Sequence, residues 1–252
     1  MKNMMKIDYF NQDACLNNKT ILVTGAGAGI GKATAIACAH YGAEVILLGK
    51  TTAKLEQTYD EIMALKQNVK EPAIVPMDLA GATEQNYRDF ALTIEQTFGC
   101  LDGIAHCAGQ LGSVMPFEQF PTDMIENVFK VNVTAPFVLM KALLPVLKKS
   151  ASASVVFSSS SVGRKGRAFW GPYAISKFAT EGMMQVLADE YDNTKIRFNC
   201  INPGATATEM RRNAYPAEDA SQLQQPAEVA PLYVYLLSPA SHQYNGQSVN
   251  AQ

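Results

Sequence analysis

Apolar and polar positions follow two alternating patterns along this chain. Short, largely apolar runs occur at 20–24, 44–48, 73–77 and 101–105. Between them, apolar residues recur every three or four positions, which is the spacing of an amphipathic helix. The segment after the first run keeps this spacing up to Gly42, a residue suited to end a helix. Strands that alternate with helices at this interval predict βαβ units, a parallel sheet and right-handed crossovers.

The alternation continues to the end of the chain. Helical spacing is found over 51–67, 83–98, 122–147, from about residue 173 onward and over 226–237, and apolar runs recur near 155–158, 195–201 and 246–250. We therefore predict a single α/β domain over residues 20–252. Its expected architecture is a Rossmann-type, doubly wound parallel sheet with helices on both faces.

Two segments fall outside this regular pattern. Residues 1–19 are expected to form an N-terminal leader that is either poorly ordered or a short helix outside the first strand. Residues 205–225 are polar, rich in alanine and weakly periodic. Because loops of this length are usually functional or disordered, we predict that they form a mobile segment over the substrate site.

Composition excludes several partners. The chain has 252 residues, of which 48% are hydrophobic and 17% charged, with a formal net charge of -2. This balance gives no electrostatic surface for nucleic acid, so we expect no nucleic-acid partner. No membrane partner is expected either, since the longest apolar candidate is broken by Lys141, Pro145 and Lys148.

Cysteine and histidine usage points to a reducing compartment without a metal site. The five cysteines are scattered and include no C-x-x-C pair, and the three histidines show no metal-ligand spacing. The first residues also lack the apolar core and cleavage site of a secretory signal. We therefore expect a cytoplasmic protein with free thiols and no metal.

A glycine-rich turn follows the first predicted strand and opens the first predicted helix. It contains Gly25, Gly29, Ile30 and Gly31. Backbone can approach a pyrophosphate only where no Cβ intervenes, and a helix N-terminus offers free N–H groups. The alternative is ordinary loop chemistry, but the strand before and the helix after favour a phosphate site.

The end of the second strand suggests which dinucleotide is bound. Enzymes that prefer NAD commonly place an acidic residue there, on the ribose 2′-hydroxyl. This chain carries Lys50 instead, which would attract a 2′-phosphate. We therefore predict NADP(H), with NAD less favoured. The alternative is a solvated lysine at a helix N-terminus, where a compensating anion is expected.

Tyr173 and Lys177 lie four residues apart on a predicted helix, so they share one face. A neighbouring cation stabilises a phenolate, which would bring the tyrosine pKa toward the working range. The alternative is a half-buried tyrosine covered by a lysine stem. Asn132 lies among apolar neighbours on another predicted helix. It is either a structural hydrogen-bond hub or a functional group.

Taken together, these motifs resemble the short-chain dehydrogenase/reductase family over essentially the whole chain. The matching positions, in the family's order, are Thr24, Gly25, Gly29, Ile30, Gly31, Asp78, Leu79, Ala108, Gly109, Asn132, Ser160, Tyr173, Lys177, Pro203, Gly204 and Thr208. Ser160 is chosen among four consecutive serines because it precedes Tyr173 by the family's spacing. The resemblance implies an NADP(H)-dependent oxidoreductase that interconverts a carbonyl and an alcohol of a small molecule.

The resemblance also implies a role for each residue of the site. Tyr173 would exchange a proton with the substrate oxygen, Ser160 would hydrogen-bond that oxygen, and Lys177 would bind the nicotinamide ribose and depress the Tyr173 pKa. Asn132 would fix a water that links Lys177 to solvent. The remaining cofactor contacts would come from Asp78 and Leu79 at the adenine, Ala108 and Gly109, and Pro203, Gly204, Thr206 and Thr208 at the carboxamide and pyrophosphate. The family's usual dimer surface implies a homodimer or homotetramer.

One departure from the family motivates an alternative function. Where the family usually has Asn-Asn before Ala-Gly, this chain has His106 and Cys107, and a thiol makes the expected hydrogen bonds poorly. The alternative is a non-catalytic NADP(H)-binding sensor or scaffold.

Two further sets of residues are possible substrate contacts. The basic residues Arg164, Lys165 and Arg167 either bind an anionic handle or form a solvated face. An apolar pocket, or alternatively plain core and loop packing, is expected at Leu111, Met115, Phe117, Phe169, Trp170 and Tyr215.

Overall fold

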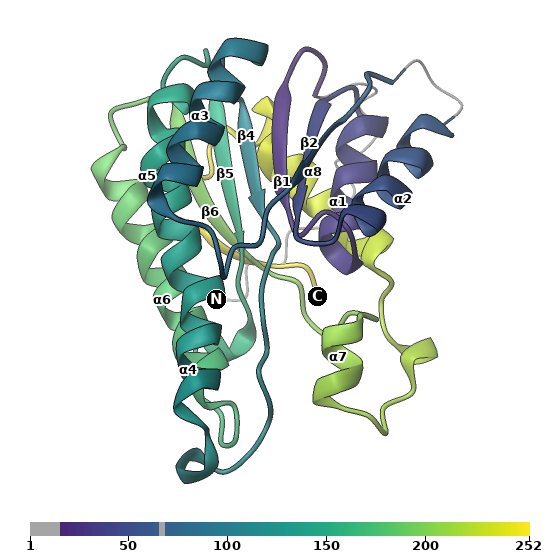
Figure 1. Cartoon of the computed structure of the whole chain (residues 1–252), viewed down its shortest axis with the longest axis vertical. Helices are drawn as coiled ribbons and strands as arrows, with labels where there is room; N and C mark the ends of the chain where they lie inside the picture. The colour runs from purple at the N-terminus through teal and green to yellow at the C-terminus, as the bar shows by residue number, and fades with distance from the viewer. Residues whose placement is uncertain (1–15, 66–68) are drawn as a thin grey trace.

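The computed structural model describes residues 16–65 and 69–252 (Figure 1). Residues 1–15 of the predicted leader lie outside the described part. Leu16 is fully buried, and its backbone N–H donates to the carbonyl oxygen of Tyr41 at 2.9 Å. Lys19 forms an ion pair with Asp102 at 3.1 Å. Residues 16–19 therefore pack as part of the domain.

A seven-stranded, all-parallel sheet forms the centre of the molecule. Its strands are β1 (Thr20–Thr24), β2 (Glu44–Gly49), β3 (Ala73–Pro76), β4 (Gly103–His106), β5 (Ala153–Ser158), β6 (Ile196–Asn202) and β7 (Ser248–Asn250). Their order in the sheet is β3-β2-β1-β4-β5-β6-β7. The prediction of a single-domain, Rossmann-type parallel sheet is confirmed. The strand order reverses between β1 and β4, and in such sheets ligands bind in the crevice beyond this point.

Helices cover both faces of the sheet (Figure 1). They are α1 (Gly29–His40), α2 (Thr52–Met63), α3 (Glu84–Phe98), α4 (Thr122–Phe129), α5 (Ala135–Leu147), α6 (Gly171–Glu190), α7 (Glu209–Ala214) and α8 (Pro226–Leu237). One core layer contains buried residues of α3, α5 and α6, and the other contains those of α1, α2 and α8. This is the doubly wound arrangement that the sequence predicts.

Strands near the centre of the sheet, such as β1, are largely apolar because both of their faces are covered. In β1, Leu22 packs into the layer of α3 and α5, whereas Ile21 and Val23 pack into the layer of α1 and α8. Successive side chains of a strand point to opposite faces, so a strand buried on both sides tends to carry apolar residues at consecutive positions.

The long helix predicted over 122–147 is continuous but contains a wider π-helical turn, η3 (Lys130–Thr134), between α4 and α5. Asn132 lies in this turn and is buried. Such single π turns often occur at functional sites. Pro136 follows the turn in the first residues of α5, and Pro145 lies inside α5.

The same stretch, Thr122–Leu147, has 26 residues and is long and apolar enough to cross a membrane by length and composition. The expectation of no membrane-spanning run rests on the breaks at Lys141, Pro145 and Lys148, which do not take the stretch outside this criterion. A core helix meets the same criterion, and Leu139 and Leu143 are fully buried beside the sheet. We therefore assign the stretch to the core layer.

The segment 205–225 forms α7 and a short turn, η5 (Ala220–Gln222). Its two ends meet in an isolated bridge between Thr206 and Gln224. In Figure 1 this segment projects from the body of the domain near α1 and α8. Its mobility stays a prediction.

Candidate active site

The glycine turn between β1 and α1 allows two backbone segments to come unusually close. A Cβ on Gly31 would stand 2.3 Å from the carbonyl oxygen of Gly25, and one on Gly25 would stand 2.9 Å from the Cα of Ala108. Gly25 and Gly29 also have positive φ angles of +68° and +53°. The turn therefore requires glycine and packs directly against the Ala108 turn after β4.

The first turn of α1 is suited to an anion. Its N-cap residue, Ala28, makes no side-chain cap hydrogen bond within the described part of the chain, and the turn contains no acidic residue. The N–H groups at the start of a helix carry partial positive charge. Together with the glycine cradle, they fit the pyrophosphate of a dinucleotide.

The loop after β6 also packs against the glycine turn between β1 and α1. A Cβ on Gly29 would lie 3.3 Å from the Cγ2 of Thr208, whose hydroxyl accepts from the backbone N–H of Arg211 at 3.1 Å and caps α7. The side-chain amide of Gln252 donates to the carbonyl oxygens of Pro203 at 2.7 Å and Ala205 at 3.1 Å. The predicted cofactor loop is therefore held beside the glycine turn, with Thr206 buried within it.

Lys50 and Asp78 follow neighbouring strand ends, because Gly49 of β2 pairs with Pro76 of β3. Lys50 is exposed, and no ion pair involves it in the described parts of the chain. The compensating anion expected for a solvated lysine is therefore missing there. The Asp78 carboxylate accepts from the backbone N–H of Ala80 at 3.0 Å, and Leu79 is buried beside it.

Tyr173, Lys177 and Ser160 converge at the carboxyl end of β5. Tyr173 and Lys177 are both buried on α6, with the Lys177 Nζ atom 5.6 Å from the centre of the Tyr173 ring. The Lys177 ammonium donates to the carbonyl oxygen of Ser158 at 2.7 Å. A Cβ on Gly163 would stand 2.8 Å from the Lys177 Cβ, so the turn after Ser160 packs closely on α6.

Burial is the main cause of the pKa shifts of Tyr173 and Lys177. It raises the pKa of Tyr173 to about 12, and the neighbouring Ser160 hydroxyl offsets only part of the rise. It lowers the pKa of Lys177 to about 8. Burial thus outweighs the effect of the neighbouring groups on the Tyr173 pKa. That Lys177 lowers this pKa stays a prediction.

Asn132 is a hydrogen-bond hub between three elements. Its Oδ1 atom accepts from the backbone N–H of Gln110 at 2.7 Å, and its Nδ2 atom donates to the carbonyl oxygen of Gln110 at 2.8 Å and to the Ser176 hydroxyl at 2.9 Å. A Cβ on Gly109 would lie 3.6 Å from this Oδ1 atom and 3.7 Å from the Lys177 Nζ atom. Asn132 therefore stands close to Lys177, and its predicted water-binding role stays a prediction.

His106 and Cys107 are accommodated by packing. The His106 ring stacks on Phe157 with centroids 4.7 Å apart, and burial lowers its pKa to about 3. Its Nε2 atom has no hydrogen-bond partner among the described residues. Burial raises the pKa of Cys107 to about 11, so the thiol stays protonated. A hydrogen bond still links the end of β1 to the turn after β4, because the backbone N–H of Ala108 donates to the Thr24 hydroxyl at 3.1 Å.

A small apolar cluster surrounds Tyr173 and shows which predicted pocket residues reach the site. Its members are Leu111, Val162, Trp170, Tyr173, Ala174, Met210 and Ala214. Phe117 and Phe169, by contrast, are largely exposed. Sequence reasoning missed Val162, Met210 and Ala214. Met210 and Ala214 lie in the weakly periodic segment 205–225, where apolar spacing gives little signal.

The three basic residues before Tyr173 do not form one site. Arg164 pairs with the buried Glu181, with its Nε atom 3.3 Å from the Oε1 atom. Arg167 donates to the Tyr215 hydroxyl at 2.9 Å, and Lys165 is exposed. Arg164 is engaged within the fold, which disfavours a single anionic handle for all three residues.

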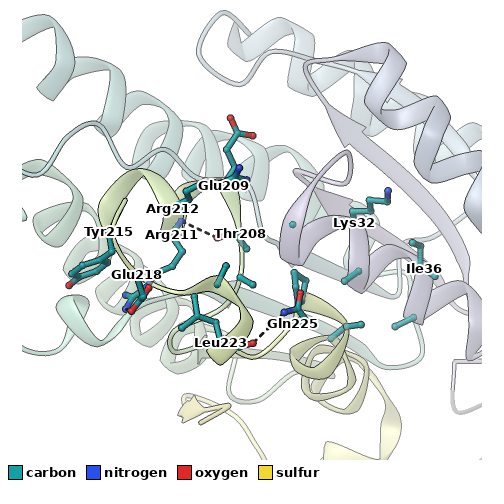
Figure 2. Close-up of a pocket in the computed structure, with 18 of the residues that line it drawn as sticks. Lys32, Ile36, Thr208, Glu209, Arg211, Arg212, Tyr215, Glu218, Leu223 and Gln225 are labelled. Carbon is teal, nitrogen blue, oxygen red and sulfur yellow. Dashed lines mark hydrogen bonds and ion pairs between the residues drawn. The ribbon is translucent and has the colours of Figure 1, made fainter.

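A cavity of about 810 Å³ lies beside α1, bounded by the segment 205–225 and the start of α8 (Figure 2). Its lining includes Gly29, Lys32, Ile36, Thr208, Arg211 and Tyr215. Tyr173, Lys177 and Ser160 do not line it. The cavity therefore flanks the glycine turn and is separate from the tyrosine site. Residues 16–65 and 69–252 contain no cluster of side chains that could hold a metal ion.

Comparisons with known proteins agree with this arrangement. The family model for short chain dehydrogenases matches residues 19–219. YciK of Escherichia coli K12, an uncharacterized oxidoreductase, is 48% identical over 237 residues, which cover 94% of this chain and 93% of YciK.

Two similar solved structures contain a nicotinamide dinucleotide. A short chain dehydrogenase from Shigella flexneri 2a, complexed with NADP, is 47% identical and has a TM-score of 0.92, covering 96% of this chain and 100% of its own. One from Escherichia coli CFT073, complexed with NADPH, is also 47% identical with a TM-score of 0.92, covering 96% of this chain and 99% of its own.

Proposed function

The chain belongs to the short-chain dehydrogenase family, and on that premise we propose that it is an NADP(H)-dependent oxidoreductase that interconverts a carbonyl and an alcohol. The observation that carries this proposal is the convergence of Ser160, Tyr173 and Lys177 at the carboxyl end of β5, next to the glycine turn. Each group alone has an ordinary structural explanation, but the three together form a site for proton transfer to oxygen.

In the direction of reduction, the phenol of Tyr173 donates its proton to the carbonyl oxygen. With a pKa of about 12, this phenol is protonated at neutral pH and therefore ready to donate. The Ser160 hydroxyl hydrogen-bonds the same oxygen and fixes its position. Lys177, with a pKa of about 8, remains largely charged at neutral pH and stabilises the phenolate left behind. When bound, the nicotinamide supplies the hydride.

The residues around the glycine turn are suited to hold the cofactor. We assign the pyrophosphate to Gly25, Gly29, Ile30 and Gly31 with the N-terminus of α1. The carboxamide side is assigned to the loop from Pro203 to Thr208, and the adenine to Asp78 and Leu79. Lys50 is assigned to the 2′-phosphate, which the NADP and NADPH complexes of the two similar structures support.

The surroundings of Tyr173 favour an apolar substrate. The side chains of Leu111, Val162 and Met210 pack around the phenol with Trp170. A carbonyl compound with an apolar body would bury its hydrocarbon there while its oxygen faces Ser160 and Tyr173. We therefore propose apolar aldehydes and ketones as the class to test.

Replacing Tyr173 by phenylalanine tests the reaction. Tyr173→Phe removes the proton donor, so kcat with a reducible carbonyl should fall by at least about a hundredfold. Affinity for NADPH, measured by fluorescence titration, should change little. Tyr191→Phe, just after the end of α6, is the matched control. If Tyr173→Phe keeps wild-type turnover, the assignment of Tyr173 as proton donor is wrong. If the wild-type protein binds NADPH but reduces nothing across a broad carbonyl panel, a non-catalytic sensor or scaffold is favoured.

Replacing Lys50 by aspartate tests the cofactor assignment. Lys50→Asp places a carboxylate where the 2′-phosphate is expected, so the Kd for NADPH should rise by about tenfold or more while the Kd for NADH changes less. Titrating both nucleotides by fluorescence measures this preference. Lys70→Asp makes the same charge change at a lysine that pairs with Glu44 near the start of β2, and should leave the preference intact. Equal affinities in wild-type protein would contradict the assignment.

We also propose that the chain forms a homodimer or homotetramer through α5 and α6. Phe137 on α5 is 59% exposed, and Phe178 and Val186 on α6 are 45% and 62% exposed. Large apolar side chains gathered on neighbouring helices often mark an interface. Phe137 lies on the helix that follows Asn132, and Phe178 and Val186 lie on α6 with Tyr173.

A further inference from the structure

A buried carboxylate lies one helical turn after Lys177. Glu181 on α6 is only 6% exposed, and its Oε1 atom accepts hydrogen bonds from the Ser159 hydroxyl, the Ser248 hydroxyl at 2.7 Å and the Arg164 Nε atom at 3.3 Å. Burying a carboxylate is unfavourable unless it is paired and hydrogen-bonded. Here one oxygen accepts from two donors in the segment between β5 and α6 and from one donor in β7.

Its partner Arg164 extends the network toward the cofactor loop. One terminal nitrogen donates to the Asn250 Oδ1 atom at 2.7 Å, and the other donates to the Val249 carbonyl oxygen at 3.2 Å. The same Asn250 oxygen accepts from the Asn202 side chain at 3.0 Å. The Asn202 Oδ1 atom in turn accepts from the backbone N–H of Gly204 at 3.2 Å. A continuous series of hydrogen bonds thus joins Arg164 to Gly204.

The other end of the network reaches the proton-transfer site. Ser159 immediately precedes Ser160, and its backbone N–H donates to the Ile201 carbonyl oxygen at 2.7 Å. Glu181 and Lys177 lie on the same face of α6, four residues apart. The ion pair between Glu181 and Arg164 therefore stands between the catalytic side chains and the loop that follows β6.

We propose that Glu181 and Arg164 are positioning residues, which hold the Ser160 turn and the Pro203–Gly204 loop in one fixed relation, so that the substrate oxygen and the cofactor are aligned together. The inference rests on the proposed function, because it assigns these residues to the alignment of that site. Arg164 has a geometry that lysine cannot copy, since its three nitrogens donate to three different acceptors.

The charge of Glu181 also acts on Lys177. It is one of the groups that raise the Lys177 pKa, against the larger lowering by burial. Glu181→Gln should therefore lower the Lys177 pKa further and move the alkaline limb of the pH–rate profile to lower pH. A change in stability alone would not produce this shift.

The test compares Arg164→Met, Arg164→Lys, Glu181→Gln and the double variant Arg164→Met/Glu181→Gln, with Lys195→Met, at an exposed lysine just before β6, as the control. We expect Arg164→Met to weaken NADPH binding and to lower kcat, each by roughly tenfold. Arg164→Lys should recover only part of this loss. The double variant should lose about as much as the worse single variant, because both substitutions break one network. The control should match wild type.

Asn250→Ala provides a second variant if the loss of a buried charge prevents folding. It interrupts the path between Arg164 and Asn202 but leaves the ion pair in place. We expect a smaller loss of NADPH affinity than in Arg164→Met, with faster amide hydrogen exchange at 204–208 in both. Unchanged affinity, kcat and exchange in folded Arg164→Met and Asn250→Ala would overturn the inference.

The exchange measurement separates this inference from the proposed function. If wild-type protein neither binds NADPH nor reduces any carbonyl, the proposed function fails. Faster exchange at 204–208 in Arg164→Met would even then support the link between the two loops, and unchanged exchange would refute it.

Discussion

The imidazole of His106 lies flat on the ring of Phe157 at the end of β4 and is shut off from water. Burial lowers its pKa to about 3, so the folded protein keeps this side chain neutral where the unfolded chain would take up a proton. Tyr173 and Lys177 also have pKa values displaced toward their neutral forms, for the same reason. At the scale of the residue, desolvation controls the protonation of this site.

His106 should make the protein sensitive to acid. Between about pH 6.5 and 3 the unfolded state binds one proton more than the folded state at this residue, so stability falls as pH falls, by about 1.4 kcal/mol per pH unit. His106→Asn should flatten this slope in urea unfolding measured at pH 7, 6 and 5. His40→Gln, which changes an exposed histidine on α1, should keep the slope. Parallel slopes in wild type and His106→Asn would contradict the argument.

At the scale of the element, the long helix of α4, η3 and α5 carries one buried polar side chain in its π-helical turn. Asn132 lies in that turn and connects it to Gln110 after β4 and to Ser176 on α6. These hydrogen bonds hold the loop after β4 and helix α6 against the long helix.

Asn132→Ala should destabilise the fold by about 2 kcal/mol, because it leaves the buried Ser176 hydroxyl and the Gln110 backbone without these partners. The loss should appear as a lower midpoint in urea unfolding followed by circular dichroism. Asn127→Ala, at an exposed position of α4, is the matched control and should change stability by less than about 0.5 kcal/mol. A loss no larger than that of the control would show that the hub adds little.

The elements themselves could be predicted because their signals are local. The apolar run of β1 and the helical spacing that leads to α8 each lie within one short stretch of sequence, and the prediction placed β1 at its observed bounds. The spacing of Tyr173 and Lys177 was likewise readable, since a helix brings residues four apart together.

What the sequence did not reveal depends on contacts between distant segments. Arg164 meets Asn250 and Glu181 only because β5, α6 and β7 are brought together in the fold. The sign of the Tyr173 pKa shift depends on burial, which no local pattern reports. Met210 reaches Tyr173 from a segment whose polar composition hides it.

At the scale of the whole molecule, the exposed apolar side chains of α5 and α6 are not explained by packing within one chain. Phe178→Glu with Val186→Glu should convert an oligomer into monomers, because an interface of standard size cannot bury two unpaired carboxylates. Light scattering after size-exclusion chromatography measures the mass directly. Met63→Glu on α2 is the control for an exposed apolar residue elsewhere. If the wild-type protein is a monomer in solution, the proposal of an interface through α5 and α6 is wrong.

The order of the strands also bears on how the chain folds as it leaves the ribosome. The strands β1, β2 and β3 are synthesised first and can pair with one another, but β1 pairs on its other side with β4, whose last residue is His106. Until that residue has emerged, the nascent chain presents an unpaired strand edge flanked by the apolar side chains of Ile21 and Val23. Such edges readily pair with other chains, so the nascent chain is exposed to aggregation until β4 has emerged.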